Sequence, residues 1–521
     1  MNISYKPYRP YYSQVNPYLP NYTHLPSHRG KRAESSRNSI YDPYNKFRKP
    51  VRSSRSKWRQ RYSDQKMFPY NYFEHPSLRN GNNVISQFQI PEIGMQPESA
   101  IQMILDEMML DGKPTLNLAT FVTTRMEPTA DRLYAETYNK NLIDKCEYPQ
   151  TMAIENRCVR ILAELWHSPD PLHSIGVSTS GSSEACMLGG LALKRRWQKA
   201  RKKQGMSIHR PNIVFSSAVQ IVWKKFANYW DVEPRYVNIT PDHLTMDPEG
   251  VLAAVDENTI GVVPTFGVTY TGLYEPVEKI AKALDELQSK TGLDIPIHVD
   301  AASGGFVAPF LQPELVWDFQ LPRVKSINVS GHKYGLVYPG IGWVIWRETE
   351  DLPEDLIFHV SYLGGNFPTF ALSFSRPSAQ VLLQYYNFLR LGRAGYYEVQ
   401  KASQTIAHFL SSKLQAIGPF EILTDGSDIP VVTWRLKEGS TSNWSLYNLS
   451  HQLLAFGWHV PAYPLPANME NVTIMRVVVR NEFSINMAQL FLNNLKQAVS
   501  YLNSLDHPTP HETYCDINFR H

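Results

Sequence analysis

Short apolar runs alternate with longer stretches of helical period between about residues 116 and 395 of this 521-residue chain. The runs are five or six residues long and rich in Val and Ile, as buried strands of a parallel sheet are. They lie at 211–215, 259–264, 295–300 and 325–329. A stretch between them, 273–291, has the spacing of an amphipathic helix. The alternation predicts an α/β domain with a mostly parallel central sheet covered by helices.

The pattern changes after about residue 395, where strand and helix patterns follow in a different order. Helical stretches are expected at 398–416, 444–456 and 487–503, and strands at 431–436 and 475–480. This predicts a smaller C-terminal α+β domain. We therefore expect five parts: an arm at 1–80, an N-terminal helical segment at 81–115, a large domain at 116–395, a small domain at 396–505 and a tail at 506–521.

The arm at 1–80 has a composition unlike the rest. It holds 16 Lys or Arg against four acidic residues, with eleven Tyr, nine Pro and one Gly, so its net charge is +12 while the other 441 residues carry −8. No helical or strand period runs through it, so we predict a disordered arm that cannot bury enough apolar surface to offset its ordering entropy. Three roles stay open: a solvated tail, an organelle transit peptide, or a segment that contacts an anionic surface such as RNA or a membrane.

Cysteine content and hydropathy narrow the class of protein. Four cysteines, at positions 146, 158, 186 and 515, form no CxxC pair, which indicates reduced thiols in a cytoplasmic protein. No apolar run approaches the ~18–20 residues that span a bilayer, and no apolar signal region begins the chain. We expect no transmembrane segment and no metal site.

A lysine and an acid each stand directly after, or at the end of, a predicted strand. Lys333 closes Ser330-Gly331-His332-Lys333, and a lysine held there can be partly desolvated, which lowers its pKa and makes the amine nucleophilic. A solvated surface lysine is the commoner case. Asp300 ends the run at 295–300, where an acid is costly unless it is paired. A pyridinium nitrogen would supply that charge, and a helix N-cap is the alternative.

A third motif, Ser180-Gly181-Ser182-Ser183-Glu184, precedes a helical stretch. Small hydroxyl residues at a helix N-terminus can hold a phosphate group through hydroxyls, backbone N–H groups and the helix dipole. A plain capping box, a serine followed by a glutamate, is the alternative. The three motifs together are more specific than any one of them.

In combination the motifs resemble the pyridoxal-phosphate (PLP)-dependent glutamate decarboxylases of the plant and bacterial type, within the group II amino-acid decarboxylases. The resemblance covers roughly residues 97–505 and implies the type I fold of PLP-dependent transferases. The matching segments are 117–121, 139–144, 147–149, 181–185, 298–306, 330–335 and 340–347.

The resemblance implies a role for each matched position around the cofactor. Lys333 would bind the cofactor's aldehyde, and Asp300 would pair with its ring nitrogen. The ring would lie between Gln220 and Ala302, beside Thr269. The phosphate would be held by Ser182, Ser183, Ser330 and His332, joined by Ser375 of a neighbouring subunit.

The resemblance also implies substrate and regulatory roles. The distal carboxyl of the substrate would be bound by Thr120, Phe121, Asn141 and Asp144, and its α-carboxyl by Arg476. Tyr362 would donate a proton to the substrate carbon that loses CO₂. His521 would silence the site near neutral pH, because imidazole changes charge there, with a frayed terminus as the alternative. Lys224 stands where relatives show His or Glu near the cofactor, so we expect a second amine near Lys333.

The implied reaction is the decarboxylation of L-glutamate to 4-aminobutanoate and CO₂, in a homodimer or a higher homo-oligomer. An Asp in the distal-carboxyl pocket requires a shared proton, because two carboxylates repel each other, so we expect better substrate binding at acidic pH. Two alternatives remain: a decarboxylase of another small acidic amino acid, or a degenerate PLP-binding homologue that acts as a scaffold.

Overall fold

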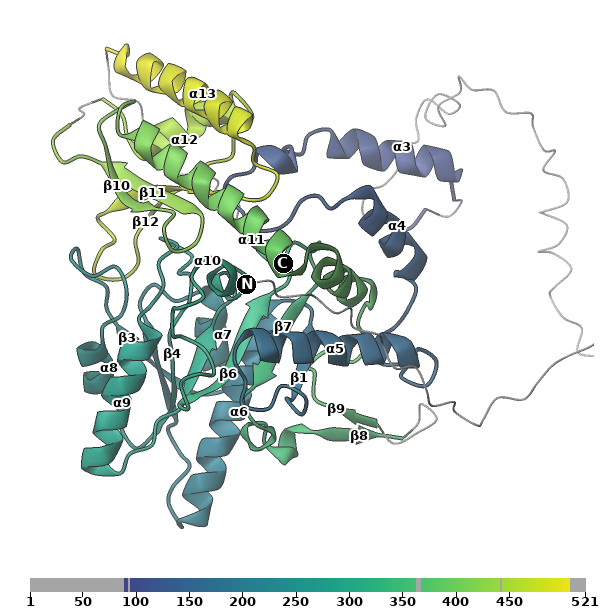
Figure 1. Cartoon of the computed structure of the whole chain (residues 1–521). Coiled ribbons are helices and arrows are strands. Elements are labelled where there is room, and N and C mark those ends of the chain that lie inside the picture. Colours follow the sequence, from purple (N-terminus) through teal and green to yellow (C-terminus); the bar gives the residue numbers. More distant parts are fainter. Residues whose placement is uncertain (1–88, 92–93, 362–366, 441–442, 507–521) are drawn as a thin grey trace, which may run out of the picture. The chain divides into compact units, whose positions relative to one another are not determined.

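The computed structural model describes residues 89–91, 94–361, 367–440 and 443–506 (Figure 1). The chain divides into two compact units, 1–103 and 104–521. Helix α3 (Pro97–Met108) begins in the first unit, in the predicted N-terminal helical segment. The predicted arm at 1–80 and all but the first residue of the tail at 506–521 lie outside the described residues.

A seven-stranded sheet forms the centre of the large domain, with the order β1-β7-β6-β5-β4-β2-β3. β7 runs antiparallel to both of its neighbours, and the remaining neighbouring pairs are parallel. The α/β fold with a mostly parallel sheet is therefore confirmed. Its strands are β1 (Gly176–Thr179), β2 (Asn212–Ser216), β3 (Glu233–Val237), β4 (Thr259–Val263), β5 (Ile297–Asp300), β6 (Val324–Ser330) and β7 (Gly342–Trp346).

Helices cover this sheet, and α6 contacts five of its strands. Its apolar residues are buried along most of its length, with Leu188 and Leu193 at 2 % and 1 % exposure. The α-helices of this domain before α11 are α4 (Pro128–Thr137), α5 (Pro149–Leu165), α6 (Ser182–Lys203), α7 (Ile221–Tyr229), α8 (Pro248–Ala254), α9 (Val277–Thr291) and α10 (Ala308–Leu311). Short elements complete it: the 3₁₀ turns η1 (Pro114–Leu116), η2 (Gly304–Phe306), η3 (Thr349–Asp351) and η4 (Glu354–Leu356), and the hairpin β8 (Phe358–Val360) with β9 (Phe367–Thr369).

One long helix, α11 (Ala379–Leu414), connects the two sheets of the second unit. It is interrupted at Gly392, whose φ of 58° and ψ of −172° are not helical. The helix that we expected at 398–416 corresponds to the stretch after Gly392, and a further helical stretch from Ala379 precedes this glycine. The helical stretch before Gly392 was not predicted.

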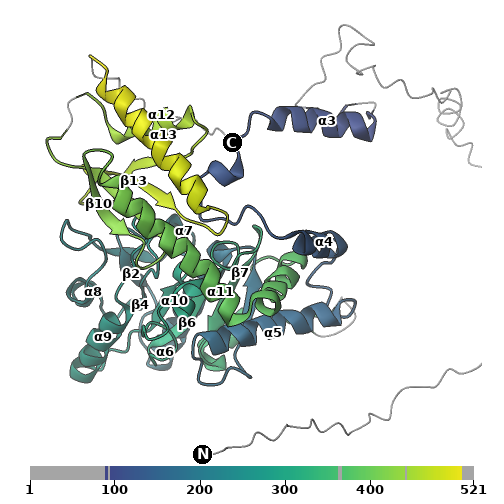
Figure 2. The same ribbon diagram turned by 45° about the horizontal axis from the view of Figure 1, so that its top comes forward.

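The small domain contains a four-stranded antiparallel sheet of order β10-β11-β13-β12. Figure 2 shows α12 and α13 beside the end of α11, and α13 contacts both of the other helices. Leu410, Trp434 and Phe491 lie in their shared core, each 0 % exposed. The predicted α+β character is confirmed. The elements are β10 (Phe420–Asp425), β11 (Val431–Leu436), α12 (Leu446–Leu454), β12 (Ala462–Pro464), β13 (Thr473–Val478) and α13 (Ile485–Asn503).

None of the helices in the described part of the chain combines the length and apolar character that a membrane crossing requires.

Candidate active site

The predicted cofactor residues follow five strands that run in the same direction. Carboxyl ends of parallel strands meet at one edge of a sheet, where open α/β sheets bind ligands. β1 leads to Ser182, β2 to Gln220, β4 to Thr269, β5 to Ala302 and β6 to Lys333. Residues as far apart in the chain as Ser182 and Lys333 therefore come together at this edge.

Lys333 lies three residues after β6. Burial lowers the pKa of its amine from the ordinary value, while nearby Asp300 acts in the opposite direction. Its Nζ donates a hydrogen bond to Oγ of Ser303 at 3.1 Å and lies 5.0 Å from the centroid of the Phe121 ring. A buried amine with a neutral oxygen as its hydrogen-bond partner, near a carboxylate, is suited to act as a nucleophile toward an aldehyde.

Asp300 is the last residue of β5 and is 2 % exposed. Its Oδ2 accepts a hydrogen bond from Nε1 of Trp223 at 2.8 Å. Its Oδ1 accepts hydrogen bonds from Nδ2 of Asn328 at 3.0 Å and from the backbone N–H of Ala302 at 3.2 Å. The next helical turn, η2, is preceded by Ser303 rather than by Asp300, so the alternative of a helix N-cap does not describe this acid.

The start of α6 lies beside the end of β6, because Oγ of Ser182 and Oγ of Ser330 are 2.6 Å apart. The backbone at the start of α6 approaches the backbone of β7 closely. A Cβ added at Gly342 would lie 2.4 Å from the carbonyl carbon of Gly181, so only glycine fits there. Glu184 also accepts a hydrogen bond from the backbone N–H of Ser180 at 2.8 Å. A cap-like contact and a group of hydroxyls at the helix N-terminus are therefore both present.

His332 packs against this helix start. Its Nδ1 lies 2.9 Å from the carbonyl oxygen of Ile341, which can only accept, so Nδ1 carries the proton and Nε2 of the neutral ring is an acceptor. Burial, with Lys333 beside it, lowers the pKa of His332 to about 4. For Nε2 to donate to a phosphate the ring must gain a second proton, which the negative charge of the phosphate favours.

Arg476, on β13 of the small domain, reaches the same region. Its Nη1 donates to the carbonyl oxygen of Thr269, and its Nη2 donates to that of Ala119 at 2.5 Å. The guanidinium carbon lies 4.8 Å from the centroid of the Phe121 ring. The Nε atom is buried without a hydrogen-bond partner. This cation, with Thr120 next to Phe121 in the chain, can receive a carboxylate.

The two residues expected on either side of the cofactor ring, Gln220 and Ala302, are both half-buried. Gln220 is the N-cap of α7, and its Oε1 accepts a hydrogen bond from the backbone N–H of Val222 at 2.6 Å. Ser183, in the first turn of α6, is exposed.

Asn141, Asp144 and Ser375 form a second group. Nδ2 of Asn141 lies 3.4 Å from Oγ of Ser375, its Oδ1 accepts from the backbone N–H of Arg376 at 3.2 Å, and Asp144 follows on the same short segment. Ser375 is exposed. Among the described residues, no hydrogen bond joins this group to Lys333. The predicted Tyr362 and His521 lie outside the described residues.

The expectation that Lys224 brings a second amine near Lys333 is wrong. Lys224 is exposed, and its Nζ lies 5.8 Å from the centroid of the Tyr236 ring. The helical period of α7 turns Trp223 and Phe226 inward and Lys224 outward. Reading that period would have identified Trp223 as a side chain that faces the protein interior.

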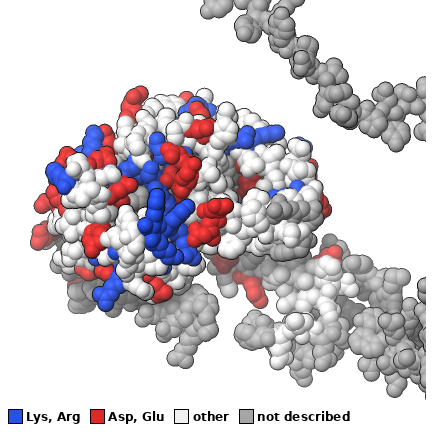
Figure 3. Space-filling model, turned by 90° about the horizontal axis from the view of Figure 1, so that it is seen from below, with Lys and Arg blue, Asp and Glu red and all other residues white. Residues whose placement is uncertain are grey.

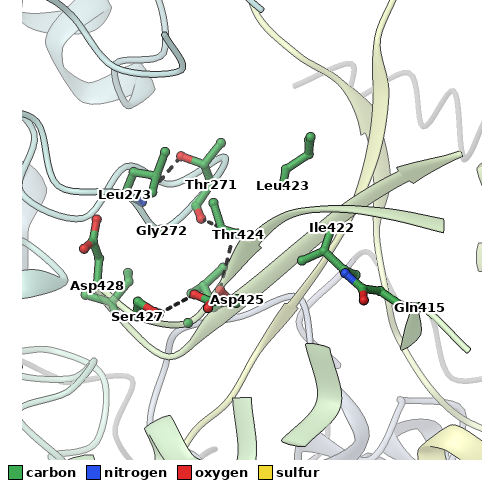
Figure 4. Close-up of a pocket in the computed structure, with 13 residues that line it drawn as sticks. Thr271, Gly272, Leu273, Gln415, Ile422, Leu423, Thr424, Asp425, Ser427 and Asp428 are labelled. Carbon is green, nitrogen blue, oxygen red and sulfur yellow. Dashed lines mark hydrogen bonds between the residues drawn. The ribbon is translucent and has the colours of Figure 1, made fainter. Parts of the chain in front are cut away.

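A cavity of about 330 Å³ lies elsewhere, between the turn at 271–273 and the β10–β11 hairpin (Figure 4). Several of its polar groups pair with one another: Oγ1 of Thr424 donates to the carbonyl oxygen of Thr271 at 2.8 Å, and Asp425 accepts from the backbone N–H of Ser427 at 3.0 Å. None of the predicted site residues lines it.

Lys and Arg side chains also gather on one face of the molecule, bordered by acidic side chains (Figure 3). The C-terminal end of α6 lies on this side in Figure 1, and its last turn carries Arg201, Lys202 and Lys203. Cations there complement the helix dipole. This end is about 30 Å along the helix from Ser182, so the patch is separate from the candidate site.

The donor set fits pyridoxal 5′-phosphate. Lys333 offers a buried amine to the aldehyde, the Ser182–Ser330 pair and the start of α6 offer hydroxyl and N–H donors to the phosphate, and Asp300 offers a carboxylate to the ring nitrogen. Among the described residues, no group of His, Cys, Asp and Glu is arranged to hold a metal ion. Fold and site define a PLP-dependent enzyme of the type I fold.

Comparisons with known proteins indicate which family of PLP-dependent enzymes the chain resembles. Residues 91–437 match the family described as the pyridoxal-dependent decarboxylase conserved domain. A glutamate decarboxylase of Aliivibrio fischeri is 52 % identical over 426 residues, 82 % of this chain and 91 % of the relative. One from Lactococcus lactis subsp. lactis is 48 % identical over 421 residues, 80 % of this chain and 90 % of the relative.

A solved structure agrees with these relatives. The glutamate decarboxylase of Lactobacillus brevis superimposes with a TM-score of 0.79 at 46 % identity, covering 82 % of this chain and 97 % of that one. A sphingosine-1-phosphate lyase of Burkholderia pseudomallei, with a TM-score of 0.68 and 21 % identity over 80 % of this chain and 93 % of its own, shares the fold. This chain belongs to the pyridoxal-dependent decarboxylase family and, within it, to the glutamate decarboxylases.

Proposed function

We propose that this protein removes the α-carboxyl group of L-glutamate and releases 4-aminobutanoate and CO₂. The observation that carries the proposal is the half-buried Lys333, whose amine has a lowered pKa and lies near Asp300, beside the group of serines at the start of α6, in a chain 52 % identical to a glutamate decarboxylase. A degenerate scaffold would have no reason to keep such a lysine and a buried carboxylate together.

Each residue that holds the cofactor is assigned to the part of the cofactor that it binds. Lys333 binds the aldehyde, Asp300 the ring nitrogen, and Ser182, Ser183, Ser330 and His332 the phosphate, with Gln220, Ala302 and Thr269 around the ring. When bound, pyridoxal phosphate serves as the electron sink for the pair left on Cα when CO₂ departs. The protein's part is to orient the substrate, to keep Asp300 available for the ring nitrogen and to exclude water.

Arg476 is the proposed partner of the substrate's α-carboxylate. Its buried and unpartnered Nε, together with the Phe121 ring against its guanidinium, favours a planar anion as ligand. Thr120 and Phe121 lie beside it in the same site. Tyr362 is proposed to protonate Cα, on the evidence of its sequence motif alone.

The distal carboxyl is assigned to Asn141 and Asp144 of a second copy of the chain. Among the described residues, Asn141 is hydrogen-bonded to Ser375 and Arg376, and neither Asn141 nor Asp144 is hydrogen-bonded to Lys333, which supports a site completed by a neighbour. A homodimer is then the minimum active unit. We further propose a cytoplasmic location, which is consistent with the free thiols of Cys146, Cys158 and Cys186, and regulation by His521.

The test is CO₂ release from a panel of amino acids by the purified holoprotein. We expect release from L-glutamate, and much less from L-aspartate, which is one methylene shorter. Lys333→Ala should abolish both this activity and the visible absorbance of the bound cofactor. Lys224→Ala, which removes an exposed amine, is the matched control and should keep both. Release from aspartate but not from glutamate would refute the proposal.

A further inference from the structure

A chain of buried polar side chains leads to Asp300 along two neighbouring strands. The parallel register places His298 beside Ser326 and Asp300 beside Asn328. Nδ1 of His298 lies 2.7 Å from Oγ of Ser326, and its Nε2 lies 2.8 Å from Oδ1 of Asn328. Nδ2 of Asn328 donates to Oδ1 of Asp300 at 3.0 Å. All four side chains belong to residues that are at most 2 % exposed.

The partners fix the direction of every hydrogen bond in this chain. An ionised Asp300 can only accept, so Asn328 presents its NH₂ group to Asp300 and its carbonyl oxygen to His298. Nε2 of His298 must then carry a proton. Burial lowers the pKa of His298 to about 4, so the ring is neutral and its Nδ1 accepts from the hydroxyl of Ser326. Each donor therefore points toward Asp300.

The other carboxylate oxygen is held from a different element. Nε1 of Trp223, on α7, donates to Oδ2 of Asp300 at 2.8 Å, and the thiol of Cys186, on α6, lies 3.7 Å from the same atom. A carboxylate has about four acceptor sites. Three are taken by N–H donors, counting the backbone of Ala302, and the fourth faces only the weak thiol donor. That site can still accept a stronger donor.

Packing prevents these side chains from turning away. A Cβ added at Gly189 of α6 would lie 2.4 Å from Cε1 of His298, so the helix backbone closes over the imidazole. The rings of Trp223 and His298 meet edge to face, with centroids 5.2 Å apart. Fully satisfied buried networks of this kind make the surrounding structure rigid and specify one arrangement.

We propose that Trp223 and Asn328 are positioning residues for Asp300, with His298 and Ser326 fixing the orientation of the Asn328 amide. They hold the carboxylate in one orientation and turn its remaining acceptor site toward the ring nitrogen of the cofactor. The inference rests on the proposed role of Asp300 in PLP binding. It adds four residues that touch neither the substrate nor, by this account, the cofactor.

The test uses holoprotein reconstituted with cofactor that is ¹⁵N-labelled at the ring nitrogen. The ¹⁵N chemical shift reports whether that nitrogen is protonated, whatever the activity. We expect a protonated nitrogen in the wild type. Trp223→Phe keeps a ring and removes the N–H, and Asn328→Leu keeps the size and removes the amide. Both should shift the signal toward the unprotonated form and raise the cofactor's Kd about tenfold or more.

Trp346→Phe is the matched control. Trp346 is 0 % exposed like Trp223, but its indole Nε1 is buried without a partner. This variant loses the same packing volume and should keep the wild-type ¹⁵N signal and Kd. If Trp223→Phe does not fold, Asn328→Leu alone decides the result.

The variant Asp300→Asn distinguishes a failure of the proposed role of Asp300 from a failure of the proposed positioning role of Trp223 and Asn328. If it leaves the ¹⁵N signal unchanged, the proposed role of Asp300 is wrong. If it shifts the signal while Trp223→Phe and Asn328→Leu both behave like the wild type, the positioning role is wrong and the proposed function stands.

Discussion

At the residue scale, the side chains that carry chemistry could be predicted, and those that support them could not. Lys333 and Asp300 stand out in the sequence because a charged residue at the end of an apolar run is unusual. Trp223, Asn328 and Cys186 look like ordinary core residues. Their contacts with Asp300 depend on how α6, α7 and β6 pack, which one-dimensional patterns do not contain.

The two buried histidines should make the stability of the cofactor-free protein depend on pH. The pKa of His298 and of His332 is lowered to about 4, whereas histidine in an unfolded chain titrates near 6.5. Between about pH 6.5 and 4 the unfolded chain therefore binds protons that the folded chain does not. Stability contributed by these groups is present above this window and is lost as pH falls through it.

Thermal unfolding of the apoprotein across that window measures the effect. The midpoint should fall with acidification, and His298→Gln should make the fall shallower. An equal fall in the variant would show that His298 is protonated in the folded protein.

Asp144 is expected to make substrate binding better at acidic pH. Two carboxylates side by side repel each other unless they share a proton. In Asp144→Asn the KM for glutamate should depend less on pH than in the wild type, as steady-state kinetics from pH 4 to 7 will show. An unchanged acid optimum would remove Asp144 from the distal-carboxyl pocket.

At the element scale, the strands that carry the site were predicted closely. The run at 325–329 corresponds to β6 (Val324–Ser330), and that at 211–215 to β2 (Asn212–Ser216). Buried parallel strands can be recognised in a sequence because the residues on both of their faces are apolar. The stretch of α11 before Gly392 was not predicted, because a glycine in a sequence does not say whether the chain is helical on both sides of it. In the structure α11 contacts α5 and α4.

Gly189 should be sensitive to the smallest substitution, because α6 approaches His298 so closely. Gly189→Ala places a methyl group 2.4 Å from the imidazole, an overpacking that typically costs about 1–3 kcal/mol. Although alanine favours helices, the melting temperature should fall. Lys199→Ala, at an exposed position of the same helix, should leave it unchanged. A Gly189→Ala protein as stable as the wild type would show that α6 can move away freely.

At the scale of the whole molecule, no hydrogen bond among the described residues joins the group of Asn141, Asp144 and Ser375 to Lys333 within one chain. We assign them to one site built by two copies, a relation that no single-chain pattern can display. The boundary between the large domain at 116–395 and the small domain at 396–505 also stays a proposal. α11 crosses it, with Gly392 three residues before it.

Mixed oligomers test the shared site. Lys333→Ala and Asp144→Leu should each be inactive alone. In a mixed dimer, Lys333 of one chain and Asp144 of the other form one intact site. Co-refolding equal amounts should therefore recover about a quarter of wild-type activity. Activity no higher than that of the separate variants would place both groups in the same chain's site.

Removal of the basic arm at 1–80 should leave cofactor binding and the decarboxylation reaction unchanged. Every assigned residue lies after position 115, so a protein lacking residues 1–80 should keep the wild-type Kd for cofactor and kcat/KM for glutamate. A large loss in either would mean that the arm takes part in folding or assembly of the site.

The central claim is that the α-carboxyl group, and not the distal one, leaves L-glutamate. Holoprotein incubated with L-glutamate carrying ¹³C only at C1 can be followed by ¹³C NMR. The account predicts that all of the label appears as CO₂ and bicarbonate, while the 4-aminobutanoate formed is unlabelled. Label retained in an amino-acid product, or glutamate left unchanged by protein that holds its cofactor, would contradict it.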